Sequence, residues 1–124
     1  MRIYISGPVS GMPDNNVAAF ATAAYRLRQA GHEVYSPVEF IPSRFSHQQA
    51  ILMCLRELTR NSGAVPAGMG KHALKPRYEV MVQLDGWQES LGAQLEAEVA
   101  DACGIERMTL DEFLEKPRLS REAE

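Results

Sequence analysis

The sequence predicts a three-layer α/β sandwich, and three observations lead to this prediction. Strand-like and helix-like patterns alternate along the 124 residues, which is typical of a mostly parallel sheet covered by helices on both faces. Glycine or proline follows most of these patterns and bounds the elements sharply. The length suffices for one hydrophobic core but would leave each of two domains short of one, so we expect a single domain.

The first part of the chain has the pattern strand, helix, strand. Arg2 to Ser6 is a β-rich alternating run that stops at a Gly-Pro pair. After a long loop, Asp14 or an adjacent asparagine can cap a helix over Val17 to Ala30, and Gly31 can end it in the left-handed conformation. A short strand over His32 to Ser36 follows. Because a helix connects the two strands, we expect them to be parallel.

The second part of the chain continues the alternation. An S-x-x-Q capping box at Ser46 and a T-x-x-E box at Thr109 each mark a helix start. We predict helices over Ser46 to Arg60, Ser90 to Cys103 and Thr109 to Lys116, and strands over Tyr78 to Leu84 and Ile105 to Met108. The complete pattern indicates a central, mostly parallel sheet of four to five strands in a flavodoxin-like or Rossmann-like arrangement. Ligands of such sheets bind beyond the carboxyl ends of the strands.

One segment interrupts this pattern. Residues Asn61 to Pro76 contain three glycines and two prolines and have no sustained period, so we expect an exposed loop that is long for a compact domain. The domain is therefore predicted to span residues 1–116, with an inserted loop at 61–76. The last residues, 117–124, are polar and are expected to form a frayed tail.

The charge balance argues against a nucleic-acid polymer as partner. The chain has 13 Lys and Arg residues against 16 Asp and Glu, a net charge of −3, and so lacks the positive excess that binding to a phosphate backbone requires. The longest apolar run is too short to cross a membrane, and the start turns polar too soon for a signal peptide. A single small nucleotide is compatible with this composition.

The cysteines carry little information about chemistry. Cys54 and Cys103 offer neither a disulfide framework nor the spacing of a metal site. No zinc motif and no Ser-His-Asp order stands out elsewhere. We therefore expect a protein of the reducing cytoplasm that holds no metal.

The helix predicted over Ser90 to Cys103 carries the most informative acidic residues. At 100° per residue, one apolar stripe is formed by Leu91, Leu95, Val99 and Ala102. Glu96 and Glu98 lie on opposite borders of that stripe, and Gly92, one turn before Glu96, leaves space for a ligand beside its carboxylate. The simpler interpretation, which the pattern alone favours, is that both glutamates are surface residues flanking a buried stripe.

Other segments offer weaker signals. Ser90 can cap the helix, and the free N–H groups at that end suit an anion, although a cap alone is the commoner role. The loop Gly7 to Gly11 follows a strand but is neither a dinucleotide fingerprint nor a P-loop. Trp87 is more often a packing residue than a stacking platform, and His32 and His47 are more often surface histidines than catalytic ones.

Three runs of residues, taken together, match a known pattern. They are the opening I-Y-I-S-G-P-V-S-G from Ile3, the G-H-E-V turn from Gly31 with Pro37 after it, and the run L-x-G-W-x-x-S-x-G-A-x-x-E-x-x-x-A from Leu84. With these runs the chain resembles the nucleoside 2-deoxyribosyltransferase-like superfamily, and it is most similar to a small uncharacterised branch of it found in bacteria and phages. The resemblance covers about residues 2–108 without the inserted loop, and the late run is its most specific part.

The resemblance implies an activity and a set of site residues. Members of the superfamily cleave or exchange the N-glycosidic bond of 2′-deoxynucleosides or their 5′-monophosphates. By this resemblance Glu96 is the nucleophile, Tyr4 orients its carboxylate, and Ser90 binds a phosphate at the helix N-terminus. The implied substrate-binding residues are Gly7, Ser10, Gly11, Asp85, Trp87, Ser90 and Gly92.

The chain departs from the superfamily pattern at three places. Cys54 occupies the position where the resemblance implies an aspartate that helps to protonate the departing base, and a thiol is a poor substitute. Asp85 replaces a proline and adds a carboxylate near the site. The inserted loop at 61–76 is unusual for the branch and could cover the site or form a subunit contact.

We therefore expect a nucleotide N-glycosidase or deoxyribosyltransferase that acts on a 2′-deoxynucleoside 5′-monophosphate without metal or organic cofactor. The resemblance also implies a homo-oligomer, since relatives complete their sites across a subunit interface. Two alternatives stay open. One is a non-catalytic nucleotide-binding protein with the same pocket, which Cys54 favours; the other is a structural or interaction module, for which the inserted loop is the argument.

Overall fold

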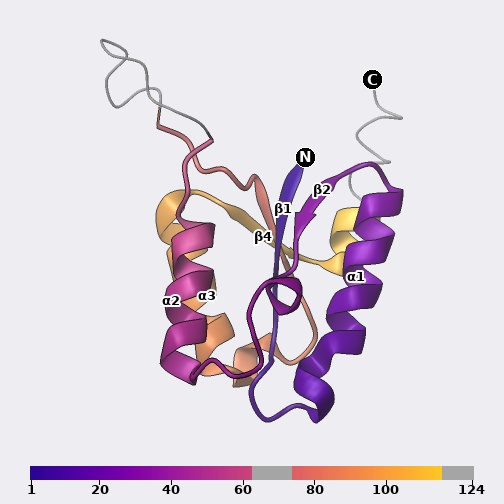
Figure 1. Cartoon of the computed structure of the whole chain (residues 1–124). Helices are drawn as coiled ribbons and strands as arrows, with labels where there is room; N and C mark the ends of the chain where they lie inside the picture. The colour runs from indigo at the N-terminus through magenta and orange to yellow at the C-terminus, as the bar shows by residue number, and fades with distance from the viewer. Residues whose placement is uncertain (63–73, 116–124) are drawn as a thin grey trace, which may run out of the picture.

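A four-stranded, all-parallel sheet forms the centre of the molecule and confirms the predicted α/β sandwich (Figure 1). The computed structural model describes residues 1–62 and 74–115. The strands are β1 (Arg2–Ser6), β2 (Glu33–Tyr35), β3 (Val80–Gln83) and β4 (Glu106–Thr109), in the order β2-β1-β3-β4. Helix α1 (Val17–Gln29) covers one face of the sheet, and α2 (His47–Leu58) and α3 (Leu91–Cys103) cover the other.

Alternate residues of β1 point to the two faces of the sheet. Ile3 and Ile5 pack on the α1 side, whereas Tyr4 belongs to the core on the α2 and α3 side. Ser6, two positions after Tyr4, shares its side and is 1% exposed. Because β1 pairs with both β2 and β3, its carboxyl end lies centrally at the sheet edge where parallel sheets bind ligands.

Helix α1 begins at Val17, as predicted, but without the predicted cap. Asn16 occupies the cap position without a side-chain cap hydrogen bond, so neither Asp14 nor an adjacent asparagine acts as the predicted cap. Asp14, Asn15 and Asn16 have positive φ angles of 49°, 52° and 60°, a left-handed conformation that Asp and Asn adopt more readily than other residues except glycine. The Asn16 Nδ2 donates to the Pro8 carbonyl at 2.9 Å. This side chain therefore holds the loop after β1 instead of capping the helix.

Two other helix starts follow the sequence closely. Ser46 and Gln49 form the predicted capping box before α2, with each side chain bonded to the backbone of the other residue. Thr109 and Glu112 form the corresponding pair, at 2.9 and 3.2 Å, before a last helical segment at residues 110–115. Both starts are fixed by bonds between residues three positions apart, which is why the sequence motif locates them.

The buried face of α3 is not the one predicted. Leu91 and Leu95 are 76% and 37% exposed. The buried residues of the helix are Ala93, Glu96, Ala97 and Ala100. The alanines allow the helix to lie close to the sheet, and hydrogen bonds from β1 hold Glu96 there and compensate for its burial. The interpretation of Glu96 as a surface residue is therefore wrong, and the leucines form an exposed stripe instead of a buried one.

The predicted inserted loop is described only at its ends. Asn61 and Pro76 form an antiparallel bridge, and the Ser62 N–H donates to the Lys75 carbonyl at 2.9 Å. The rest of the loop and the predicted tail at 117–124 lie outside the described residues. Within 1–62 and 74–115, no helix has the length and apolar character needed to cross a membrane.

Candidate active site

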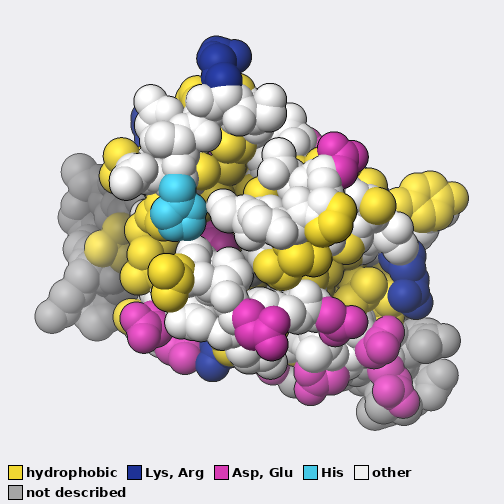
Figure 2. All heavy atoms as spheres, turned by 90° about the horizontal axis from the view of Figure 1, so that it is seen from below, with side chains coloured by type: hydrophobic (Ala, Val, Ile, Leu, Met, Phe, Trp, Pro, Cys, Tyr) yellow, Lys and Arg dark blue, Asp and Glu magenta, His cyan; other side chains and the backbone are white. Residues whose placement is uncertain are grey.

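A cavity of about 390 Å³ opens at the carboxyl ends of the strands. It is lined by the loop after β1, part of the segment 37–45 after β2, one side of α2 as far as Leu55, and α3 from its start to Glu96. Figure 2 views this end of the molecule and shows hydrophobic side chains gathered around a hollow. The volume lies within the range of small-molecule sites, and the position is the one expected for a ligand of a parallel α/β sheet.

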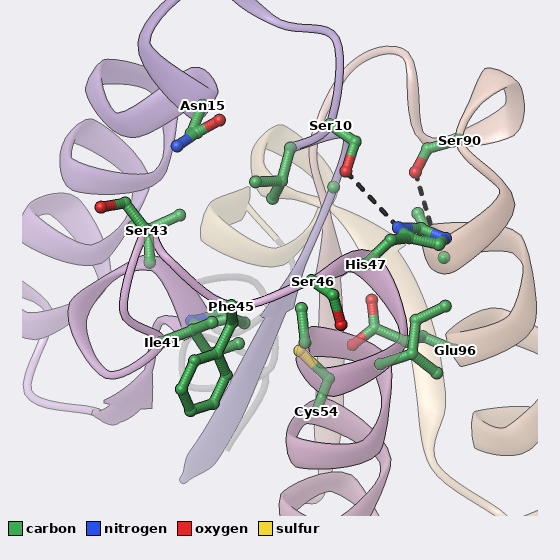
Figure 3. A pocket seen from close by; sticks show the side chains of 18 of the residues that line it. Ser10, Asn15, Ile41, Ser43, Phe45, Ser46, His47, Cys54, Ser90 and Glu96 are labelled. Carbon is green, nitrogen blue, oxygen red and sulfur yellow. Dashed lines mark hydrogen bonds between the residues drawn. The ribbon is translucent and has the colours of Figure 1, made fainter.

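Glu96 forms part of the cavity wall and is only 7% exposed. Its Oε1 accepts a hydrogen bond from Ser6 Oγ at 2.8 Å, and its Oε2 accepts one from the Tyr4 hydroxyl. Tyr4 and Ser6 can reach the same carboxylate because side chains two positions apart on a strand share one face. In Figure 3 the carboxylate points away from α3 toward Cys54 on α2. Both of its oxygens are thus tied to β1.

Burial changes the proton affinity of this carboxyl group. It raises the pKa of Glu96 to about 7, and the hydrogen bonds from Tyr4 and Ser6 oppose that rise because they stabilise the ionised form. Burial and the nearby charge of Glu96 raise the pKa of Tyr4 well above its ordinary value, so the phenol keeps its proton and remains a donor. Near neutral pH, Glu96 is therefore present both as the acid and as the carboxylate.

Aromatic packing fixes the Tyr4 ring. Its centroid lies 5.4 Å from that of Tyr35 in a stacked arrangement and 5.5 Å from that of Tyr78 in an edge-on arrangement. Both arrangements are favourable for aromatic rings, and the Tyr4 side chain is fully buried. The phenol therefore reaches Glu96 from a rigid support.

Cys54 on α2 also lines the cavity (Figure 3). Burial and the Glu96 carboxylate raise the pKa of its thiol to about 12. Such a thiol is a much weaker acid than the aspartic acid that the superfamily resemblance implies at this place. In the part of the chain that the structure describes, no three His, Cys, Asp or Glu side chains cluster so that they could hold a metal ion.

Polar side chains from three segments meet at the mouth of the cavity (Figure 3). Ser10 Oγ, in the loop after β1, lies 3.5 Å from His47 Nδ1 at the start of α2. Ser90 caps α3, where its hydroxyl accepts a hydrogen bond from the Ala93 N–H at 3.3 Å. Gly92 leaves room beside them, since a Cβ there would lie 3.9 Å from His47 Cε1, an ordinary contact. The N-termini of two helices therefore face one opening.

Residues 1–65 match one protein family, a domain of unknown function named DUF4406. The chain belongs to the DUF4406 family. No curated protein and no solved structure matches it. The segment that matches DUF4406 contains β1, α1, β2 and α2, and with them Tyr4 and Ser6, whereas Glu96 lies beyond it. The family match thus covers the two donors but not the carboxylate that they bind.

The fold of this DUF4406 chain brings most of the predicted site residues together. Those that line the cavity are Gly7, Ser10, Ser90, Gly92 and Glu96. Tyr4 joins them through its hydrogen bond to Glu96. Gly7 is required where it stands, because a Cβ there would lie 2.9 Å from Leu84 Cβ. The absence of a side chain at Gly7 therefore lets the loop after β1 pass close to the end of β3.

Gly11, Asp85 and Trp87 are not among the residues that line the cavity. The Trp87 ring instead lies against the Arg107 guanidinium, which is 5.4 Å from the ring centroid, and Arg107 forms an ion pair with Asp101 at 2.8 Å. This arrangement is the packing role that the sequence alone favoured for Trp87. A part for these three predicted residues in substrate binding stays a prediction.

Ser6 and His47 were not predicted as site residues of this DUF4406 chain. A local signal existed for Ser6, which is a polar residue two positions after Tyr4 in an otherwise apolar strand. His47 is exposed, yet among the described residues that line the cavity it is the only side chain that can carry a positive charge. Its place depends on the approach of α2 to Ser10, which lies 37 positions earlier in the chain.

Proposed function

We propose that the protein cleaves the N-glycosidic bond of a 2′-deoxynucleoside 5′-monophosphate, or transfers its deoxyribosyl group to another base, with Glu96 as the nucleophile. The observation that carries this proposal is a buried carboxylate in a cavity wall, with its two oxygens held by Ser6 and Tyr4. The resemblance of the run around Glu96 to nucleoside 2-deoxyribosyltransferase-like proteins supports the choice of bond. A carboxylate suits this chemistry because it can trap an oxocarbenium-like carbon as an ester.

The proposed reaction consists of two displacements. In the first, an oxygen of ionised Glu96 forms a bond to C1′, and the electron pair of the C1′–N bond leaves with the base, which takes a proton from water. In the second, a water molecule or the nitrogen of another base attacks C1′ and loses a proton. As the new bond to C1′ forms, the ester C1′–O bond breaks and returns its electron pair to Glu96, and the released proton goes to water. A water acceptor gives hydrolysis, and a base acceptor gives transfer.

The mouth of the cavity suits the 5′-phosphate of such a substrate. Ser10, His47 and Ser90 present hydroxyl and imidazole groups there, and the N–H groups at the starts of α2 and α3 add positive potential. No Lys or Arg is among the described residues that line the cavity. The proposed site therefore needs no excess of basic residues, which is compatible with the net charge of −3.

A non-catalytic nucleotide-binding protein is the second candidate, and Cys54 favours it. With a pKa of about 12, its thiol donates a proton to a departing base far less readily than a carboxylic acid does. In this alternative the same cavity binds the nucleotide, and Glu96 supports no turnover.

We also propose that a second copy of the chain covers the outer surface of α2 and α3, which would make the protein the homo-oligomer that the resemblance implies. Leu52 on α2 and Leu91 and Leu95 on α3 are 69%, 76% and 37% exposed, and the two helices contact each other. Exposed leucines on neighbouring helices supply apolar area of the kind that homodimer interfaces bury.

Base release distinguishes the two functional candidates. The purified protein is incubated with each of the four standard 2′-deoxynucleoside 5′-monophosphates, free base is separated by chromatography, and binding is followed by calorimetry. We expect base release by the wild type and none by Glu96→Ala. Binding without release from any of the four would favour the non-catalytic alternative, and equal release by Glu96→Ala would refute the nucleophile.

A further inference from the structure

We propose that Ser6 is a positioning residue for Glu96: its hydroxyl, together with that of Tyr4, fixes the plane of the carboxylate and the direction in which it faces the cavity. This inference rests on the proposed function, because the orientation matters for turnover only if the carboxylate attacks a ligand. The superfamily resemblance implies a role for Tyr4 but assigns none to Ser6.

One hydrogen bond does not fix a carboxylate. The last torsion of a glutamate side chain is broad and roughly two-fold, so a group held only by the Tyr4 hydroxyl on Oε2 can swing about that contact. A second donor on Oε1, the Ser6 hydroxyl at 2.8 Å, removes this freedom. With both oxygens tied to one strand, the lone pairs that face the cavity keep one direction.

The position of Ser6 is itself fixed by β3. Its carbonyl accepts a hydrogen bond from the Leu84 N–H at 2.8 Å, and it pairs in register with Gln83. Beside it, Gly7 approaches Leu84 so closely that an added Cβ would lie 2.9 Å from the Leu84 Cβ. Ser6 is also almost fully buried. Loss of its hydroxyl should therefore leave the backbone in place and remove only the donor.

In the surroundings of Glu96, the ionisation of its carboxyl group depends strongly on the hydrogen bond from Ser6. The titratable side chains that interact with the carboxyl group or share its cavity are Tyr4 on β1, Asp14 before α1, Tyr35 on β2, and His47 and Cys54 on α2. Burial raises the pKa of both tyrosines and of Cys54, so these groups stay neutral near pH 7. Without Ser6, the ionised Oε1 would be buried with no donor, which favours the acid form.

Ser6→Ala and Ser36→Ala form a matched pair that tests the proposal. Both serines are buried, but within the described residues the Ser36 hydroxyl has no hydrogen-bond partner, so Ser36→Ala controls for the loss of a buried hydroxyl. The carbon-13 resonance of the Glu96 carboxyl group, assigned with Glu96→Gln, reports its titration. Base release from the four deoxynucleoside monophosphates between pH 5 and 9 reports activity.

We expect Ser6→Ala to raise the pKa of the Glu96 carboxyl group by about one unit. At pH 7 it should lower kcat about fivefold with little change in KM, because the ionised fraction of Glu96 falls from about one half to about one tenth. This loss should be recovered at high pH, where Glu96 ionises. Ser36→Ala should match the wild type in both measurements. Ser6→Cys retains a weaker donor; it should give an intermediate pKa, and it replaces Ser6→Ala if that variant does not fold.

A Glu96 titration that is identical in the wild type and Ser6→Ala would overturn the role of Ser6. A loss of activity that is equal at all pH values and shared by Ser36→Ala would overturn it as well, because it would reflect a general packing defect. If the wild type releases no base from any of the four substrates, the proposed function fails instead. The carboxyl titration would then still decide whether Ser6 controls the ionisation of Glu96.

Discussion

Glu96 and Tyr4 are 92 positions apart in the chain and are joined by a buried hydrogen bond between carboxylate and phenol. The bond connects α3 to the central strand β1, beside the cavity at the carboxyl ends of the strands. Burial raises the pKa of Glu96 while the bonds from Tyr4 and Ser6 lower it, and the balance lies at about 7. This balance makes the ionisation of Glu96 sensitive to pH in the neutral range.

Stability should fall as the pH rises through the range in which Glu96 ionises. The pKa of about 7 in the folded protein lies above the ordinary 4.5, so between these values the folded state binds more protons than the unfolded state. From pH 5 to pH 8 the wild type should therefore lose about 2 kcal/mol of unfolding free energy relative to Glu96→Gln. Urea unfolding of both proteins at the two pH values measures this difference. Parallel pH dependence in the two proteins would contradict it.

Replacement of Ser90 should change which ligand binds. Ser90→Asp retains an oxygen that can cap α3 but adds a negative charge where we propose the 5′-phosphate lies. We expect the affinity for a deoxynucleoside monophosphate to fall at least about tenfold, with the affinity for the free deoxynucleoside unchanged. Calorimetry with both ligands measures this, and Ser90→Asn is the neutral control. If Ser90→Asp and Ser90→Asn bind the monophosphate equally well, the phosphate does not lie beside Ser90.

A charge on the exposed leucine stripe should dissociate the proposed homo-oligomer. Leu91→Asp places a carboxylate at the start of α3, where a negative charge suits the helix, so the monomer fold should be retained. In an apolar interface the same charge would be buried without a partner, and we expect the mass measured by sedimentation to fall to that of the monomer. Tyr25→Asp, at another exposed site on α1 (65% exposed), is the control. A wild type that is already monomeric would refute the proposed interface.

Much of the fold could be predicted because local signals set the element ends. Helix α2 begins at the capping box of Ser46, and α1 and α3 end shortly before Gly31 and Gly104, whose φ angles are 93° and 78°. These signals involve residues that are only a few positions apart, so a sequence pattern reveals them. The first residue of α1 was predicted correctly, but the cap of this helix was not, because Asn16 bonds to Pro8 in the loop after β1. That contact competes with the capping bond that the local pattern indicates.

By itself, the sequence determined the alternation of strands and helices and placed Glu96 on the helix after the third strand, because both follow from periodicity and helix ends along the chain. Only the tertiary structure decided which face of α3 is buried. An apolar stripe predicts burial only where no other face packs better. Here the small alanines let α3 approach the sheet, and the donors Tyr4 and Ser6 compensate for burying Glu96. The leucines consequently remain outside, and the carboxylate faces the cavity.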